Sequence, residues 1–157
     1  IFAGLFANPA IQRVAGYATC LYSIFAAKLY DIFNRSLEIY EGHYPDSARP
    51  WYFSVFSAAT FHLGSHPRRV VDDDSAWGWA AITALGNYNP DKGGHIILWD
   101  LNLVVRFPPG ATILIPRALI RYSFVSVAAH ETRYSLVQYT PAPVLNFAAN
   151  AGRTIST

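Results

Sequence analysis

The sequence predicts a mainly β domain, either a sandwich or a jelly roll, that follows a helical N-terminal segment. After Pro50, short segments rich in aromatic and β-branched residues recur at roughly ten-residue spacing, and turns rich in Gly and Pro separate them. No helical pattern lies between these segments, so we do not expect a doubly wound parallel sheet. Before Pro50, the hydrophobic residues follow the period of a helix.

The N-terminal third of the chain is predicted to be helical. Apolar residues recur at spacings of three and four over residues 11–29, which places them on one face of a helix. Asn8 directly precedes Pro9, a pair typical of a helix cap followed by proline at the first helical position. The helical pattern extends to Tyr40 and ends before Gly42.

The predicted strands lie beyond residue 50. They occupy residues 51–56 with an extension over 59–63, then 77–85, 95–98, 103–107, 112–115, 119–125 and 133–139. The strongest turn signal is NYNPDKGG at residues 87–94. We therefore expect one domain over residues 1–157, with a helical lead-in over 1–50, a β core over 51–140 and a loosely held tail over 141–157.

Composition limits the classes of partner. Hydrophobic residues make up 52% of the chain and charged residues 14%, which provides ample material for a core. The formal net charge of +2 permits an anionic partner such as DNA but does not demand one, because extended DNA-binding surfaces are usually far more basic. The uncharged run over residues 14–27 is shorter than the roughly 20 apolar residues that span a bilayer, so we expect no membrane partner.

The single cysteine, Cys20, excludes an intrachain disulfide. This usage fits a reducing compartment, so we expect an intracellular protein of the nucleus or cytoplasm. The chain begins at Ile1 and contains no methionine, so we also expect it to be a piece of a longer product.

Several segments in a fixed order carry a family resemblance. They are NPAIQRVAGYATCLYSIFAAKLYDIF at 8–33, SVFSAATFHLG at 54–64, WGWAAITALGNYNPDKGGHIILWDL at 77–101, FPPGATILIP at 107–116 and ETRYSLVQY at 131–139. In these segments the chain resembles the fungal TET/JBP-type dioxygenases, enzymes that use Fe(II) and 2-oxoglutarate to oxidise a methylated nucleic-acid base. The resemblance covers nearly the whole chain.

The resemblance implies a double-stranded β-helix, which is a jelly-roll or cupin-like core, with N-terminal helices. It also implies an iron held by two histidines and one carboxylate, and an arginine that binds the far carboxylate of 2-oxoglutarate. Arg133 in the ETRYS segment matches that arginine, and Ser135 faces the same way two residues later. The alternative interpretation of Arg133 is a surface residue paired with Glu131. The implied partners are DNA and 2-oxoglutarate or a similar dicarboxylate.

The iron ligands of the family are not found at the matching positions. Tyr122 replaces the distal histidine, and a phenol with a pKa near 10 is a poor ligand for Fe(II) at neutral pH, so a packing or hydrogen-bonding role is favoured. The histidine and aspartate of the His-x-Asp pair fall on Arg69 and Val71, and no His-x-Asp occurs anywhere in the chain. His66 and Asp72 are the alternative ligands, but they require the loop between them to fold back.

The sequence therefore predicts a degenerate, inactive member of the family, a pseudoenzyme in which iron binding is doubtful and no catalytic residue is assigned. Two alternatives stay open. One is an active nucleic-acid base dioxygenase with an altered metal site. The other is a non-catalytic module that binds a nucleic acid or a dicarboxylate. The sequence predicts no oligomeric state.

Overall fold

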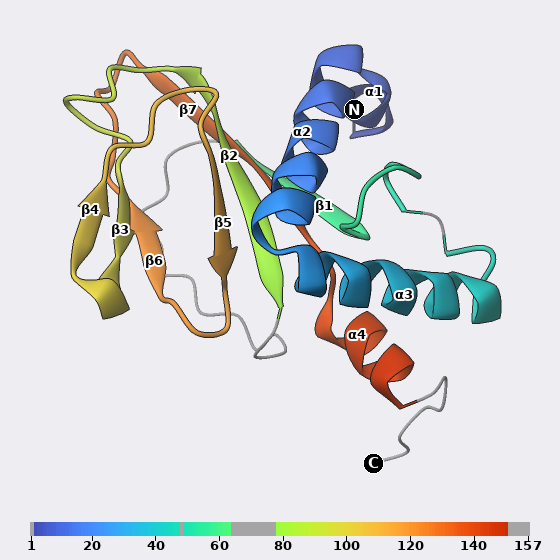
Figure 1. The fold of residues 1–157 in the computed structure, drawn as a ribbon. Helices are drawn as coiled ribbons and strands as arrows, with labels where there is room; N and C mark the ends of the chain where they lie inside the picture. Colours follow the sequence, from blue (N-terminus) through green and yellow to red (C-terminus); the bar gives the residue numbers. More distant parts are fainter. Residues whose placement is uncertain (1, 48, 64–77, 151–157) are drawn as a thin grey trace. The chain divides into compact units, whose positions relative to one another are not determined.

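The computed structural model describes residues 2–47, 49–63 and 78–150 (Figure 1). By their internal contacts, the residues form two compact units, one of residues 1–59 with 138–157 and the other of residues 60–137. Each unit is described by itself below. The single domain expected from the sequence stays a prediction. No helix in the described parts of the chain is long and apolar enough to cross a membrane.

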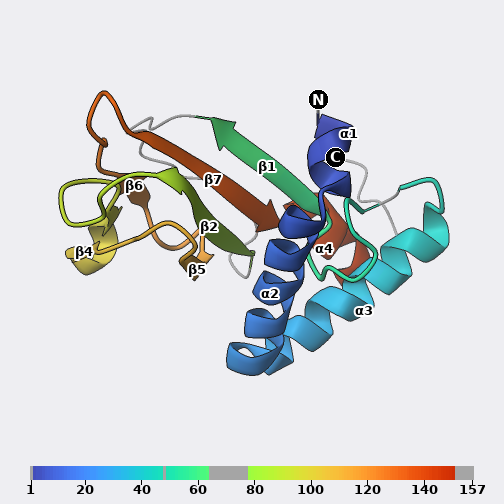
Figure 2. The same ribbon diagram turned by 90° about the horizontal axis from the view of Figure 1, so that it is seen from above.

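The first unit is built from four helices. They are α1 (Phe2–Ala7), α2 (Pro9–Phe25), α3 (Ala27–His43) and α4 (Ala142–Ala149). The predicted cap is confirmed, because Asn8 Oδ1 accepts a hydrogen bond from the Ala10 backbone N–H at 2.9 Å. Helices α2 and α3 meet end to end (Figure 2). The core of this unit includes Tyr22, whose ring centroid lies 5.4 Å from those of both Phe33 and Phe56.

Helix α4 corrects the expectation of a loosely held tail over residues 141–157. Its Val144, Leu145 and Phe147 side chains are buried. The Phe147 ring packs edge-on against Tyr40 of α3, with 5.7 Å between centroids. Burial of these apolar side chains stabilises the helix, because it removes their surface from water. Residues 151–157 lie outside the described residues.

The strand predicted over residues 51–56 is also wrong. The chain makes turns there, and the first strand, β1 (Ala58–Leu63), begins later. Trp51 and Phe56 are buried. The Trp51 indole N–H donates to the Phe6 carbonyl at 2.9 Å. The aromatic residues that suggested a strand therefore anchor a turn segment to the helices of the same unit.

The remaining strands lie wholly or mostly in the second unit. They are β2 (Trp79–Asn87), β3 (Ile96–Leu98), β4 (Leu103–Val105), β5 (Thr112–Pro116), β6 (Tyr122–Phe124) and β7 (Thr132–Tyr139), with a 3-10 helix η1 (Trp99–Leu101) between β3 and β4. One sheet has the order β1-β7-β2-β5 and the other β4-β3-β6. The registered pairs β2–β5, β3–β4 and β3–β6 are antiparallel. The predicted fold class, an α+β chain with a mainly β core and N-terminal helices, is confirmed.

Gly86, near the end of β2, permits a close approach between β2 and β7. Its φ of +105° lies in the region that side chains disfavour. A Cβ atom at this position would overlap the Thr132 carbonyl oxygen and lie 3.2 Å from Arg133 Cα. The close approach of β2 to the start of β7 therefore requires a glycine at position 86.

We predict that Gly86→Ala lowers the free energy of unfolding by about 2 kcal/mol or more, because it adds both backbone strain and overlap with β7. Chemical denaturation measures the change. Gly42→Ala is the matched control, since it lies in α3 with nothing within 4 Å of its Cβ position. That control should raise the free energy of unfolding by up to about 1 kcal/mol. Equal effects of the two substitutions would contradict the assigned role of Gly86.

Candidate functional site

The candidate site is centred on Arg133 in β7. Arg133 and Ser135 are 2% and 1% exposed, and strand alternation puts both side chains on one face of β7. Arg133 Nη1 donates a hydrogen bond to Ser135 Oγ at 2.9 Å. The structure therefore brings together the two residues that the sequence predicted to bind a co-substrate. Their binding role itself stays a prediction.

Aromatic rings form the surroundings of the guanidinium. The Arg133 Cζ atom lies 3.8 Å from the centroid of the Phe124 ring and 5.9 Å from that of Phe107. These two rings are stacked, with an interplanar angle of 11°. The Tyr88 hydroxyl donates to the Phe107 carbonyl oxygen and lies beside the guanidinium. We call Tyr88, Phe107, Phe124, Arg133 and Ser135 the Arg133 site.

The Arg133 guanidinium is a buried cation with unmet hydrogen-bonding capacity. Burial lowers the pKa of Arg133, and the nearby Tyr88 hydroxyl acts in the opposite direction. Nε and Nη2 have no hydrogen-bond partner among the described residues. These two nitrogens lie on one edge of the planar guanidinium, and their N–H groups point the same way. That edge matches the two oxygens of a carboxylate.

Glu131 is not the partner of Arg133, so the alternative interpretation of a surface ion pair is wrong. Its Oε1 accepts from the Asn89 backbone N–H at 2.7 Å, and its Oε2 accepts from the Ala128 backbone N–H at 2.9 Å. Glu131 precedes β7, which begins at Thr132, so strand alternation does not place its side chain with that of Arg133. Glu131 holds two backbone segments together outside the Arg133 site.

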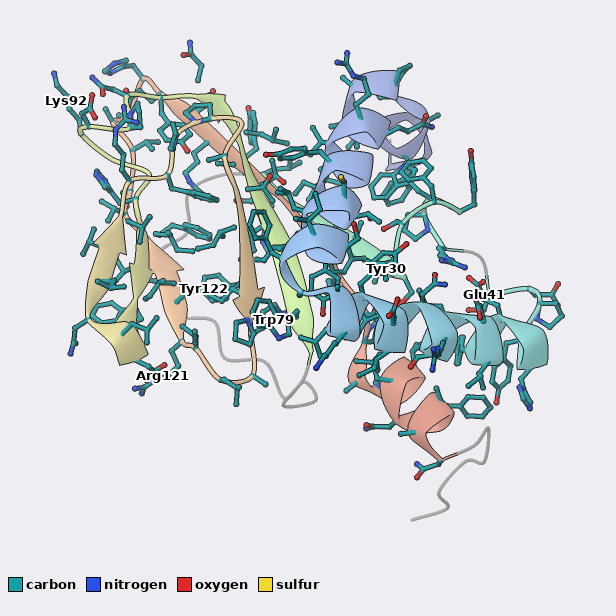
Figure 3. All side chains as sticks on the ribbon, in the orientation of Figure 1. Tyr30, Glu41, Trp79, Lys92, Arg121 and Tyr122 are labelled. Atoms are coloured by element: carbon teal, nitrogen blue, oxygen red, sulfur yellow. The ribbon has the colours of Figure 1, made fainter. Side chains whose placement is uncertain are left out.

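Tyr122, which the sequence resemblance matches to a histidine ligand, is buried in β6. Its ring packs edge-on against Phe124, with 5.7 Å between centroids. Figure 3 shows Tyr122 on the inner side of β6 toward β5, whereas Arg121 points away from the strands. Tyr122 is thus placed next to an aromatic wall of the Arg133 site.

The described residues do not fit an iron centre. In the parts of the chain that the structure covers, no group of three or more His, Cys, Asp or Glu side chains comes close enough to hold a metal ion. Two histidines and a carboxylate would be needed for the ferrous site of this type of oxygenase. The predicted positions Arg69 and Val71 and the alternative ligands His66 and Asp72 lie outside the described residues.

The fold is similar to that of NgTET1, which was solved in complex with 5mC DNA. The TM-score is 0.56 at 15% sequence identity, over 86% of this chain and 53% of the NgTET1 chain. The chain has a TET-like fold. It spans about half the length of the NgTET1 chain. No protein-family model matches the sequence, and no curated protein matches it.

Within this TET-like fold, three residues of the Arg133 site were missed from the sequence. Tyr88 follows β2, Phe107 follows β4, and Phe124 ends β6. They come from three separate elements, so no local spacing relates them to Arg133. The one sequence feature that could have indicated Tyr88 is Gly94. In the structure its φ is +72°, and a Cβ there would overlap the Tyr88 ring. A glycine at a turn of this kind indicates that another group approaches closely.

We predict that Glu131 titrates below its ordinary pKa of 4.5, because the Asn89 and Ala128 backbone N–H groups stabilise its ionised form. A lowered pKa in the folded state means that its stabilising effect is present above pH 4.5 and is lost as the pH falls. Carboxyl ¹³C chemical shifts, assigned with Glu131→Gln, measure the titration. A midpoint at or above 4.5 would show that the two bonds do not persist in solution.

Proposed function

We propose that this chain is a degenerate TET/JBP-like jelly roll that binds 2-oxoglutarate or a similar dicarboxylate at Arg133 and does not oxidise a nucleic-acid base. The observation that carries the proposal is the buried guanidinium whose Nε and Nη2 lack a hydrogen-bond partner among the described residues. A buried charge is costly unless it is paired. A bound carboxylate would supply both the opposite charge and two acceptors.

The chemistry of the Arg133 site favours a carboxylic acid with a short carbon chain. The coplanar Nε and Nη2 donors of Arg133 match the two coplanar oxygens of a carboxylate. The stacked rings of Phe107 and Phe124 offer an apolar surface to the methylene groups next to that carboxylate. Ser135 fixes the third nitrogen of the guanidinium and so holds the orientation of the fork.

The proposal includes no iron chemistry. Oxygen activation in this class of enzyme belongs to the metal, and the protein positions it. The described residues do not provide three suitable ligands, and the phenol of Tyr122 is a poor substitute for an imidazole. We therefore assign the chain a binding role and derive no oxidation step.

We predict that the protein binds 2-oxoglutarate in the presence of a metal chelator, and that Arg133→Lys weakens this binding at least about tenfold. Lysine keeps the positive charge but loses the planar pair of donors. Isothermal titration calorimetry gives the dissociation constants. Arg106→Lys is the matched control, because Arg106 is exposed and pairs with Asp91. It should bind 2-oxoglutarate as the unaltered protein does.

Three outcomes would contradict this function. If Arg133→Lys binds 2-oxoglutarate as tightly as the unaltered protein, or neither binds it, Arg133 is a structural residue only. If the protein takes up stoichiometric Fe(II) and converts 2-oxoglutarate to succinate, the alternative of an active dioxygenase with an altered metal site replaces ours. Metal-affinity measurements on His66→Ala and Asp72→Ala would then identify its ligands.

DNA binding is the second candidate function, and the similarity to NgTET1 in its complex with 5mC DNA favours it. The net charge of +2 provides little general attraction to phosphate. We predict that any affinity for a duplex containing 5-methylcytosine is weak and falls steeply with salt. Fluorescence anisotropy at two salt concentrations measures it. A tight complex that persists at high salt would instead point to specific base contacts and to DNA as the main ligand.

A further inference from the structure

Tyr88 is a buried phenol that lies next to Arg133. It is 6% exposed, and its hydroxyl donates to the Phe107 carbonyl oxygen. Burial raises the pKa of Tyr88, while the Arg133 guanidinium lowers it by a smaller amount. The phenol therefore keeps its proton at neutral pH and is a hydrogen-bond donor. Nothing in the sequence marked it as part of a binding site.

The ring of Tyr88 is held in one place. Gly94 lies against it, and a Cβ at that position would overlap the ring atoms Cε2 and Cδ2. The hydroxyl is tied to the Phe107 backbone at the other end of the side chain. With the ring fixed, the O–H bond can still rotate about the C–O bond. The proton can therefore change its acceptor without a movement of the ring.

We infer that Tyr88 is a further ligand-binding residue of the Arg133 site, and that its hydroxyl donates to the carboxylate held by Arg133. The inference rests on the proposed function. A carboxylate paired with Nε and Nη2 of Arg133, which have no hydrogen-bond partner among the described residues, would bring an ionised oxygen close to a donor that now serves a neutral carbonyl. Hydrogen bonds to ionised acceptors are roughly twice as strong as those between neutral groups, so the proton turns to the ligand.

This assignment narrows the ligand class. Arg133 Nε and Nη2 provide two coplanar donors, and Tyr88 provides a third donor beside them. A planar carboxylate accepts all three, whereas a tetrahedral phosphate leaves oxygens without partners against the Phe107 and Phe124 rings. The site is therefore assigned to small carboxylic acids, with inorganic phosphate as the anion that it rejects.

The test is the affinity of Tyr88→Phe for 2-oxoglutarate, measured by calorimetry in a metal chelator. This substitution retains the ring and its contact with Gly94 and removes only the hydroxyl donor. We expect about tenfold weaker binding, the usual effect of losing one hydrogen bond to a charged group. Tyr134→Phe is the matched control, because Tyr134 is 39% exposed in the same strand as Arg133. Its binding should not change.

A spectroscopic signal separates contact from an indirect structural effect. In protein labelled with ¹³Cζ-tyrosine, the resonance that is absent in Tyr88→Phe should shift when 2-oxoglutarate is added. The same resonance should not shift in Arg133→Lys at the same ligand concentration, and inorganic phosphate should not shift it in the unaltered protein.

The outcomes distinguish this inference from the proposed function. Wild-type affinity in Tyr88→Phe together with weak binding in Arg133→Lys overturns the role of Tyr88 and leaves the function of Arg133 intact. No binding of 2-oxoglutarate to the unaltered protein overturns both. Equal affinity for phosphate and 2-oxoglutarate overturns the assignment of the ligand class and leaves a general anion site.

Discussion

The buried charge of Arg133 is the constraint on which the second unit depends. Removing a guanidinium from water costs several kcal/mol, and a contact with an aromatic face returns about 0.5–2 kcal/mol. The rings of Phe107 and Phe124 and the hydroxyl of Ser135 therefore offset only part of that cost. An apolar residue in the same place would be cheaper for the fold alone. The ligand proposed above would complete the pairing of this arginine.

Two glycines permit the close packing around the Arg133 guanidinium. Gly86 lets β2 approach the backbone at Thr132 and Arg133, and Gly94 leaves the space that the Tyr88 ring fills. Both have positive φ, so each position combines a backbone shape with a missing side chain. The polar groups of the site are thus positioned by backbone geometry and by packing. The nearest acid in sequence, Glu131, is engaged elsewhere.

How much could be predicted from the sequence depends on the range of the interactions involved. Local alternation between turns was enough to predict β2, β5 and β7 and the direction shared by Arg133 and Ser135. The strand predicted at 51–56 was wrong because Trp51 is buried in a turn, where it contacts distant Phe6. Strand propensity cannot distinguish such a buried turn from a strand. Helix α4 was missed because its order comes from tertiary burial of Phe147. Tyr88 was not recognised as a neighbour of Arg133 because tertiary packing, and not local sequence, brings them together.

The proposed acid-binding site and the positions matched to the metal ligands belong to different elements, so the first does not require the second. A guanidinium fork binds a carboxylate through its own charge and geometry and needs no ion beside it. Arg133 lies in β7, whereas the positions matched to the ligands lie in β6 and in the segment before β2. Of these positions, Tyr122 packs against Phe124 and so supports an aromatic wall of the Arg133 site. In the proposed binding role, Arg133, Ser135 and Tyr88 would hold the acid without the affinity that a metal adds. The proposed role is therefore reversible binding of a small acid, because the described residues do not provide three metal ligands that would commit that acid to reaction.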